Sequence, residues 1–473
     1  MKDAIVLYPS PGMGHLISML ELAKLIHAHH PTFSITLIIQ SPPLNQPSTA
    51  VETSQQIAAA TAKCIAAVSA AVPSINLHHL PQISLPPTCI TLSPVQLEFE
   101  LPRLHLPTIN QILQTLSQTS KVKAFVIDFF CDAAFRVSTD LNIPTYYYFP
   151  TSAGGLSHFL YFPTEPENNS GDQPVWVPGL PPIPFTDIPE VAQDRTTEIY
   201  RKLLETSTHM ANSSGVVVNT FELLESRALR AIWDGLCTPE KRTPPPVFPV
   251  GPLISTNSDD EGENGHCLSW LNKQPSKSVV FLSFGSMGLF PAKQLTEMAM
   301  ALESSGHRFL WVVRDPPSEG EDKEQGLDEI LPEGFVERTR KRGLVVKRWA
   351  PQVAVLSHGS VGGFVTHCGW NSVLEAICGG VPMVAWPLYA EQRLNRVLLV
   401  EEFKLALPLN ESGDGLVSSA ELEKRVRELM ESERGRKVRE RVLLMRDGAK
   451  AAMDSGGTSR VALTKLTQLW KQG

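Results

Sequence analysis

Short apolar runs alternate along this chain with longer segments in which apolar residues recur every three or four positions. Residues 4–8 form the first run, and a tight loop rich in Pro and Gly follows at 9–14. The next segment has helical spacing, with apolar side chains at Leu16, Met19, Leu20, Ala23, Leu25 and Ile26. Strand-type runs recur at residues 34–39, 124–127, 215–219, 278–284, 307–313, 343–347, 363–367 and 381–385. Parallel strands joined by crossover helices produce this alternation, so the pattern predicts an α/β fold.

The alternation is interrupted near the middle of the chain. Residues 241–252 contain five prolines, and an acidic stretch follows at 259–263. Because 473 residues exceed one ordinary hydrophobic core, we expect two doubly wound domains around this break. The boundaries that we expect are a first domain at 1–245, a linker at 246–265, a second domain at 266–455 and a terminal helix at 456–473. The carboxyl ends of two such sheets can face a central cleft, where a ligand binds.

The composition of the chain limits the kinds of molecule that it can bind and the compartment in which we expect it. The formal net charge is −7, so the chain as a whole lacks the basic face that a nucleic acid requires. No run reaches the roughly 18 to 20 apolar residues that span a bilayer. The seven cysteines are odd in number and show no metal-ligand spacing, which favours a reducing compartment. We therefore expect a cytoplasmic monomer that binds small molecules rather than nucleic acid, with no membrane span.

Residues 349–392 hold a dense group of side chains suited to a nucleotide. A strand there ends in a Gly-containing turn, and a helix is expected to start near Trp370 or Asn371. The backbone N–H groups and the dipole of such a helix start suit an anionic pyrophosphate. Glu375 lies one turn beyond Asn371, so its carboxylate can accept both hydroxyls of a ribose, and Trp349 can stack on a flat base.

These 44 residues resemble the donor-binding box of plant secondary-product glycosyltransferases, in glycosyltransferase family 1. Shorter runs at 9–15, 215–221 and 283–286 are also similar to that family. The resemblance implies the GT-B fold, with two Rossmann-like doubly wound domains facing a central cleft, and UDP-glucose as co-substrate without a further cofactor. It implies these donor-binding residues: Gly14, Thr151, Ser286, Trp349, Ala350, Gln352, His367, Trp370, Asn371, Ser372, Glu375, Glu391 and Gln392.

The resemblance also implies how these residues divide the donor among them. Trp349 would stack on uracil, with the Ala350 backbone and Gln352 beside the base and ribose, while Glu375 would hold the ribose. The diphosphate would be held by His367, Asn371, Ser372 and Ser286. The sugar would be contacted by Trp370, Glu391 and Gln392, and also by Thr151.

Three positions bear on which sugar is used. Gln392 resembles the glucose-using members of the family, whereas galactose users more often carry His there. Trp370 differs from the Arg that commonly pairs with the carboxylate of glucuronate. Glu391 departs from the more common Asp, but either carboxylate can accept two sugar hydroxyls. We therefore expect glucose.

His15 and Asp128 form the second candidate group. His15 follows Gly14 where the first loop enters a helix, and the positive helix end disfavours protonation of the imidazole. Asp128 ends the strand at 124–127, on the same rim of the same sheet, and a carboxylate there can fix the imidazole tautomer. The resemblance implies that His15 deprotonates the acceptor hydroxyl with help from Asp128, and that the anomeric carbon inverts. Asp132 is the alternative partner of His15.

The sequence contains fewer features that indicate where the acceptor binds. The aromatic cluster at 146–149, with Phe159 and Tyr161, can line an apolar pocket, and the Pro- and Leu-rich region 81–99 can close over it. Residues 2–19 resemble the branch of the family that handles flavonoids, isoflavones and chalcones. In this family the terminal helix packs back on the first domain.

We therefore expect an inverting UDP-glucose-dependent O-glucosyltransferase that acts on a small phenolic acceptor such as a flavonoid or chalcone. Two alternatives stay open: C-glucosylation of the same acceptors, and a UDP-sugar or phenolic binding protein without catalysis. A Rossmann dehydrogenase is disfavoured, because Ile17 stands where the fingerprint Gly12-Met13-Gly14 needs a third glycine. No metal is expected, since no carboxylate pair of the DxD kind lies near the donor box.

Overall fold

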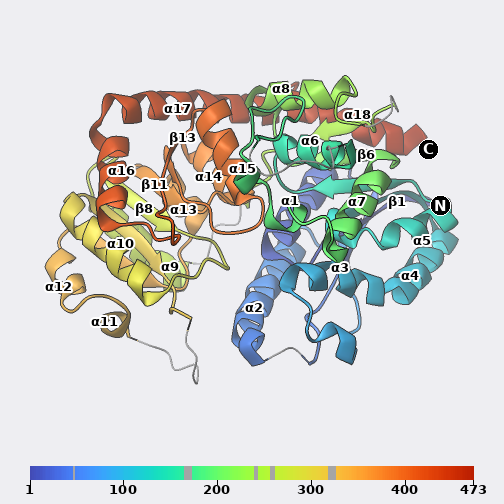
Figure 1. Ribbon diagram of the computed structural model, residues 1–473. Helices are drawn as coiled ribbons and strands as arrows, with labels where there is room; N and C mark the ends of the chain where they lie inside the picture. Colours follow the sequence, from blue (N-terminus) through green and yellow to red (C-terminus); the bar gives the residue numbers. More distant parts are fainter. Residues whose placement is uncertain (46–47, 165–172, 239–242, 256–260, 318–325, 473) are drawn as a thin grey trace. The chain divides into compact units, whose positions relative to one another are not determined.

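Two units make up the chain, and each contains a parallel sheet flanked by helices (Figure 1). The computed structural model describes residues 1–473 apart from 46–47, 165–172, 239–242, 256–260, 318–325 and 473. Unit 1 comprises Met1–Pro182, Glu190–Ser255 and Ala451–Gly473, and unit 2 comprises Ile183–Pro189 and Thr256–Lys450. The α/β class predicted from the apolar pattern is confirmed.

The described sheet of unit 1 has the strand order β3-β2-β1-β4-β5-β6-β7, and all its pairings are parallel. Its strands are β1 (Lys2–Tyr8), β2 (Ser34–Ile39), β3 (Asn76–His79), β4 (Ser120–Asp128), β5 (Thr145–Phe149), β6 (Gly215–Val218) and β7 (Val247–Pro249). The order reverses between β1 and β4, where Tyr8 lies opposite Ile127. Doubly wound sheets bind ligands outside the carboxyl ends at such a switch point. The loop after β1 and the end of β4 meet there.

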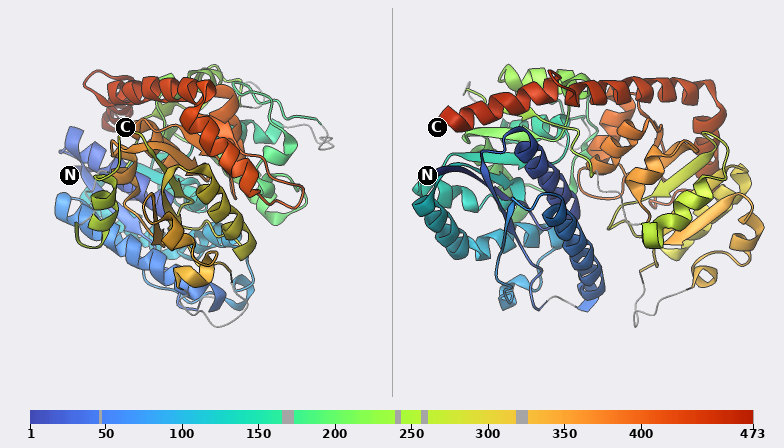
Figure 2. Two further views of the ribbon diagram at one scale, coloured as in Figure 1. Left: turned by 90° about the vertical axis from the view of Figure 1, so that its left-hand side faces the viewer. Right: turned by 180° about the vertical axis from the view of Figure 1, so that it is seen from behind.

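Helices flank this sheet, and Figure 2 shows the long α1 and α2 running beside each other. The helices of unit 1 are α1 (Met13–His29), α2 (Ser48–Ala71), α3 (Pro94–Leu104), α4 (Leu106–Thr119), α5 (Ala134–Asp140), α6 (Ala153–Tyr161), α7 (Glu198–Ala211), α8 (Glu222–Trp233) and α18 (Thr458–Gln472). The apolar face of α1 is buried against β1 and β2 in one cluster. This packing fixes the start of α1 at the switch point.

The helix α18 completes the core of unit 1. The Trp470 ring is buried and meets Phe33 and Tyr146 edge-on, at centroid distances of 6.1 and 5.8 Å. Ser459 Oγ donates to the carbonyl of Gly251 at 2.6 Å, and α18 lies beside β7. A helix near the end of the sequence therefore shares its core with the strands at the beginning.

The described sheet of unit 2 has the order β10-β9-β8-β11-β12-β13 and is again parallel. Its strands are β8 (Val279–Ser283), β9 (Arg308–Val313), β10 (Gly343–Lys347), β11 (Val361–Thr366), β12 (Met383–Ala385) and β13 (Ala406–Pro408). Its helices are α9 (Glu261–Leu271), α10 (Ala292–Ser305), α11 (Leu327–Ile330), α12 (Phe335–Thr339), α13 (Gln352–Ser357), α14 (Trp370–Gly379), α15 (Gln392–Val397), α16 (Ser419–Glu431) and α17 (Glu433–Met453). The switch point lies between β8 and β11, so the loops after these two strands meet at one edge.

Two glycines set the position of β11. A Cβ on Gly363 would lie 2.8 Å from the Leu429 side chain of α16, and one on Gly362 would lie 2.2 Å from the carbonyl oxygen of Lys277. Neither approach leaves room for a side chain. The strand that leads into the expected donor-binding box is therefore packed as tightly as its backbone allows.

Several elements do not follow the apolar pattern. The strand β3 is largely polar, and β7 and β13 have only three residues each, which is too short to show a period. The aromatic cluster at 146–149 was expected to line a pocket, but it forms β5 and is buried throughout. Its three tyrosines are therefore part of the sheet core.

The division into units differs in detail from the expected domain boundaries. Residues 246–265, expected as a linker, contain the edge strand β7 of unit 1 and the first turns of α9 of unit 2, while 256–260 lie outside the described residues. The segment Ile183–Pro189 groups with unit 2, where Asp187 accepts a hydrogen bond from Arg396 at 2.6 Å. A local sequence pattern cannot predict an ion pair between residues 209 positions apart.

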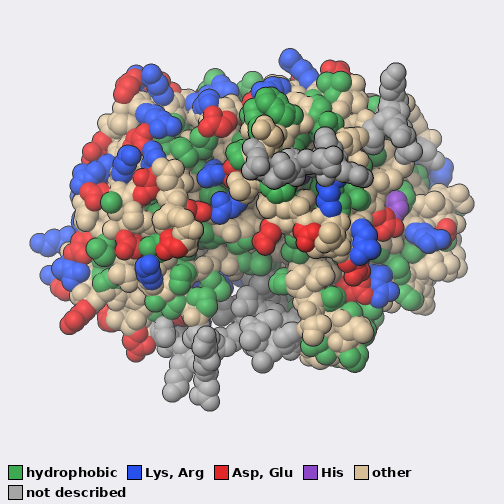
Figure 3. Space-filling model, viewed as in Figure 1, with side chains coloured by type: hydrophobic (Ala, Val, Ile, Leu, Met, Phe, Trp, Pro, Cys, Tyr) green, Lys and Arg blue, Asp and Glu red, His purple; other side chains and the backbone are tan. Residues whose placement is uncertain are grey.

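The seven cysteines all lie in described segments, and none of them forms a disulfide. Among the helices described, none is long and apolar enough to cross a membrane. Figure 3 shows acidic and basic side chains interspersed over the visible face of unit 2. Unit 2 also contains ion pairs between such side chains, for example Arg338 with Glu303 at 2.6 Å.

Candidate active site

His15 and Asp128 meet at the carboxyl edge of the unit 1 sheet, although 113 residues separate them. His15 Nδ1 lies 2.7 Å from Asp128 Oδ2. Asp128 is fully buried, and its other oxygen accepts the N–H of Phe130 at 3.1 Å. Since an ionised carboxylate only accepts, Nδ1 of the neutral imidazole carries the hydrogen and Nε2 is the basic nitrogen. The arrangement is that of a histidine base oriented by a carboxylate.

Local structure fixes both side chains. The helix α1 starts at Met13 with Gly12 as its N-cap, and the Gly12 carbonyl accepts the N–H of His15 at 3.0 Å. A Cβ on Gly12 would lie only 3.3 Å from His15 Cδ2, so the imidazole rests against a residue without a side chain. Asp128 caps the short 3-10 turn Phe129–Cys131. The imidazole therefore comes from a helix start and its carboxylate partner from a strand end.

Asp132, the alternative partner of His15, belongs to a different network. Its Oδ1 accepts from the hydroxyl of Tyr147 at 2.5 Å and from Nδ1 of His209 at 3.1 Å. This carboxylate raises the pKa of His209, whose ring stacks on Phe135 at 4.8 Å. The structure thus brings Asp128, and not Asp132, to His15.

Aromatic side chains surround His15, and among them Phe129 and Phe130 were missed by the sequence analysis. The rings of Phe129 and Phe130 lie 5.7 and 5.3 Å from the imidazole. Phe99 of α3 packs edge-on against Phe130 at 4.8 Å, and Phe159 of α6 lies 6.0 Å from Phe129. This half-buried apolar wall suits a flat aromatic ligand beside the base. Its sequence signal is the Phe pair that directly follows Asp128.

In unit 2, the turn from β11 into α14 presents backbone N–H groups. Cys368 has a left-handed φ of 66°, and the N-cap Gly369 has no side chain with which to cap the first turn. The helix α14 starts at Trp370, as expected. A helix start without a side-chain cap leaves its N–H groups and dipole for an anion. Asn371 is half-buried in this first turn, whereas Ser372 is buried.

His367 is held between two glycines at this turn. A Cβ on Gly369 would lie 2.5 Å from its Nε2, and a Cβ on Gly285, in the loop after β8, would lie 2.7 Å from the same atom. Burial lowers the pKa of His367 to about 4. The imidazole is therefore neutral near neutral pH and can donate one hydrogen bond without carrying a charge.

Trp349, Gln352, Ser372 and Glu375 lie around the start of α13. The Trp349 side chain is half exposed, and it follows Arg348, which has a left-handed φ of 67°. Gln352 Nε2 donates to Ser372 Oγ at 2.8 Å and to Glu375 Oε2 at 2.7 Å. This bridge ties the start of α13 to α14, beside an exposed indole and the buried Ala350. A base, a ribose and a phosphate can be bound by such a row of groups.

Two of the residues expected at the sugar, Glu391 and Gln392, lie in one hydrogen-bonded turn. Gln392 is buried, and its side-chain oxygen accepts the N–H groups of Leu388 and Tyr389 at 2.9 and 3.1 Å. Asn395 Nδ2 donates to the Cys368 carbonyl at 3.0 Å and to Glu391 Oε1 at 3.4 Å. Trp370 is buried with its ring 6.5 Å from that of Phe403. Trp370 is therefore mainly a core residue, and Gln392 shapes its own loop.

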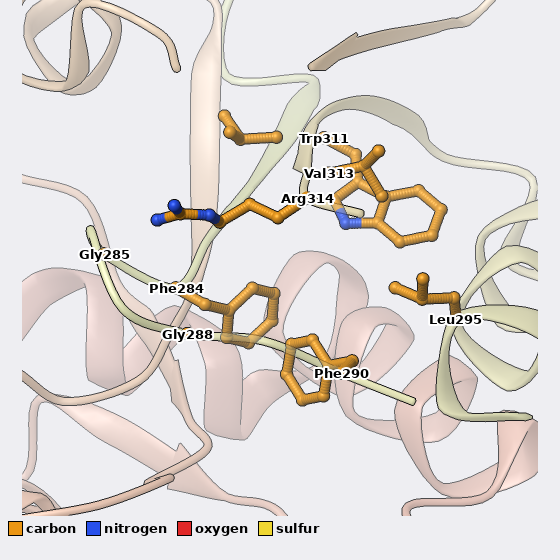
Figure 4. Close-up of a pocket in the computed structure, with 9 residues that line it drawn as sticks. Phe284, Gly285, Gly288, Phe290, Leu295, Trp311, Val313 and Arg314 are labelled. Carbon is orange, nitrogen blue, oxygen red and sulfur yellow. The ribbon is translucent and has the colours of Figure 1, made fainter. Parts of the chain in front are cut away.

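The loop after β8 has a cationic neighbour that sequence reasoning missed. Ser286 is exposed, and its carbonyl oxygen accepts a hydrogen bond from Arg314, the residue after β9. Figure 4 shows Arg314 directing its guanidinium away from the apolar side chains of Phe284, Phe290 and Trp311 that line the neighbouring pocket. Arg314 stands at the end of an apolar run, and this was its only sequence signal.

Gly14 and Thr151 lie in unit 1, whereas the other residues expected to bind the donor lie in unit 2. Gly14 is exposed in the first turn of α1. Thr151 is half-buried just before α6, whose first N–H groups, of Ala153 and Gly154, donate to the buried carboxylate of Glu225 at 2.7 and 2.8 Å. Within the described part of the chain, no group of three or more His, Cys, Asp or Glu side chains is placed to hold a metal ion.

Known proteins are similar to this chain in sequence and in architecture. The family described as UDP-glucoronosyl and UDP-glucosyl transferase matches residues 209–441. The anthocyanidin 5,3-O-glucosyltransferase of a Rosa hybrid cultivar is 56% identical over 99% of each chain, and the isoflavone 7-O-glucosyltransferase 1 of Glycine max is 50% identical over 100% of each. The solved structure of Phytolacca americana UGT2 complexed with UDP-2fluoro-glucose and pterostilbene is 38% identical, with a TM-score of 0.86 over 99% of this chain and 100% of that one.

Two Rossmann-like units with helix starts at their switch points define a glycosyltransferase of the GT-B fold, as the sequence predicted. The chain belongs to the family of UDP-glycosyltransferases, in the plant branch that contains flavonoid, isoflavone and anthocyanidin glucosyltransferases. It is therefore an enzyme of the transferase class.

Proposed function

We propose that this enzyme transfers glucose from UDP-glucose to a hydroxyl group of a small phenolic acceptor, with inversion at the anomeric carbon. The observation that carries the proposal is the 2.7 Å contact between His15 and the buried Asp128 beside an aromatic wall. The names of the relatives support the substrate classes, since they are glucosyltransferases of anthocyanidins and isoflavones.

His15 and Asp128 carry the proton chemistry in this proposal. His15 Nε2 removes the proton of the phenolic hydroxyl, and the oxygen attacks the anomeric carbon from the face opposite UDP. The bond from that carbon to the UDP oxygen breaks, and UDP leaves with the electron pair. Asp128 stabilises the imidazolium through Nδ1. The phenyl rings beside His15 hold the acceptor ring and exclude water.

Unit 2 binds the donor in this proposal. Trp349 stacks on uracil, and the Gln352–Glu375 bridge lies beside the ribose. The start of α14, with the neutral His367, holds the diphosphate and stabilises the charge of the leaving UDP. Asn371 and Ser286 add donors there, and Glu391 with Gln392 contacts the sugar. We propose that no metal or further cofactor takes part, so an excess of EDTA should leave the rate unchanged, and a loss of activity restored by Mg²⁺ would contradict this.

The test is incubation of the purified chain with UDP-glucose and a panel of phenols, followed by NMR of the product. The expected product is a β-O-glucoside, in which the anomeric carbon is bonded to a phenolic oxygen. A sugar attached to a ring carbon would instead establish C-glucosylation. His15→Ala should lose at least about 100-fold in kcat while it keeps the affinity of the wild type for UDP in calorimetry. Wild-type protein that binds UDP but glucosylates none of the phenols would overturn the proposal.

A further inference from the structure

A second carboxylate lies beside the His15–Asp128 pair. Glu98 is half-buried on α3, and its Oε2 accepts a hydrogen bond from Ser10 Oγ at 2.7 Å. Ser10 is completely buried in the loop between β1 and α1, and its Oγ also accepts the N–H of Gly12 at 3.4 Å. The loop that presents His15 is therefore joined to α3 through Glu98.

The geometry of Gly12 places Ser10 and His15 close together. A Cβ on Gly12 would lie 3.8 Å from Ser10 Oγ and 3.3 Å from His15 Cδ2, so the hydroxyl and the imidazole flank the same glycine. The residue after Glu98 is Phe99, which belongs to the aromatic wall around His15. Glu98 thus lies where the wall meets the catalytic loop.

Electrostatics agree with this position. Burial raises the pKa of Glu98 above its ordinary value, while the Ser10 hydrogen bond and the positive charge of a protonated His15 lower it and the charge of Asp128 raises it. Glu98 is therefore close enough to both His15 and Asp128 to interact with them electrostatically.

One oxygen of Glu98 remains unused. Oε2 is engaged by Ser10, whereas Oε1 has no hydrogen bond and no ion pair to any described residue. Glu100, two residues along the same helix, is instead paired with Arg103 and with Lys202. A half-buried acid that has no Lys or Arg partner among the described residues and lies beside the proposed base is more typical of ligand binding than of fold stabilisation.

We propose that Glu98 determines acceptor specificity: Ser10 holds one carboxylate oxygen, and the other accepts a hydroxyl group of the phenol other than the one that His15 deprotonates. The inference rests on the proposed function. It assigns polyhydroxylated phenols as the preferred acceptors. A phenol without the second hydroxyl would displace water from Oε1 without replacing its hydrogen bond. The buried oxygen would then lack a donor, and this lowers the affinity for such a phenol strongly.

The experiment compares two acceptors that share the hydroxyl receiving glucose, one with a second hydroxyl group and one without. The quantity measured is the ratio of their kcat/KM values. Glu98→Met keeps the side-chain volume and removes both oxygens, so the ratio should fall about 10-fold or more. Glu98→Gln keeps an oxygen acceptor and should retain the ratio within about three-fold. The matched control Glu100→Met removes the neighbouring acid of α3 and should leave the ratio unchanged.

Other results would overturn the inference. If Glu98→Met lowered kcat/KM equally for both acceptors, Glu98 would only support the loop, and a common shift of the pH profile would mean that it acts on His15. If Glu98→Met does not fold, Glu98→Asp withdraws the carboxylate by one methylene and must still lower the ratio at least about three-fold. Wild type that glucosylates both acceptors with equal kcat/KM refutes the inference alone. Wild type that glucosylates neither refutes the proposed function as well.

Discussion

Replacing Asp128 by Asn tests the proposed catalytic role of the His15–Asp128 pair. In the wild type, one carboxylate oxygen accepts the N–H of Phe130 at 3.1 Å and the other faces His15 Nδ1 at 2.7 Å. The Phe130 N–H can only donate, so the amide oxygen of the substituted side chain should take the first place and its NH₂ group the second. Nδ1 must then accept a hydrogen bond, and the hydrogen moves to Nε2. The imidazole is held in the tautomer that cannot take a proton from the acceptor.

The size of the effect follows from the step that is lost. General base catalysis contributes about 100- to 10,000-fold, or about 2.7 to 5.4 kcal/mol of barrier. We expect kcat of Asp128→Asn to fall within this range. Asp128→Ala removes the carboxylate without imposing a tautomer, so His15 can still sample the productive form. Its kcat should exceed that of the Asn variant, although Ala is the larger truncation.

The assay is the initial rate of glucoside formation at saturating UDP-glucose and acceptor. Calorimetry with UDP is the control, because Asp128 lies in unit 1 and the groups expected to bind UDP lie mainly in unit 2. Unchanged UDP affinity would show that unit 2 is folded in each variant, and an unchanged Tm would show the same for unit 1, which carries the substitution. The reasoning is refuted if Asp128→Asn keeps kcat within about three-fold of the wild type, or if it is more active than Asp128→Ala.

Three further predictions concern other parts of the chain. Gly369→Ala puts a Cβ 2.5 Å from His367 Nε2 and should weaken UDP binding at least about 10-fold in calorimetry, whereas Gly359→Ala, with nothing within 4 Å, should not. Trp349→Ala removes a stacking platform and should weaken UDP binding about 5-fold or more, while Trp176→Ala, also at an exposed indole, serves as the control. Burial raises the pKa of Glu225 from 4.5 to about 7, so the folded state binds this proton more tightly than the unfolded chain. The resulting stabilisation, of about 3 kcal/mol, is present below about pH 4.5 and is lost as the pH rises to about 7. Glu225→Gln should reduce the fall in Tm between about pH 5 and pH 8, and an equal fall in both proteins would contradict this.

The sequence predicted those parts of the fold that a local pattern of residues determines. The apolar runs predicted most of the long strands, and the start of α14 fell at Trp370 as expected. The pattern was uninformative where tertiary contacts decide the structure. The cluster at 146–149 resembles a pocket lining by composition, but as a central strand it is covered on both faces.

The same limit applies to the candidate site. His15 and Asp128 follow from a strand end, a helix start and a family resemblance, all of which are visible in the sequence. The partnership of Ser10 with Glu98 spans 88 residues and depends on how α3 packs against the catalytic loop. No periodicity encodes that contact. Arg314 was missed for the same reason, because only the fold places it against the carbonyl of Ser286.

The position of α18 has a consequence for synthesis of the protein. Strand β1 emerges from the ribosome early, but the core around it lacks Trp470 until α18 has emerged several hundred residues later. During translation, the core of unit 1 therefore stays incomplete, with apolar surface exposed to solvent, after all the strands of the unit 2 sheet have been synthesised. A premature stop codon or a fused tag near residue 458 would therefore damage unit 1, the part of the chain that holds His15.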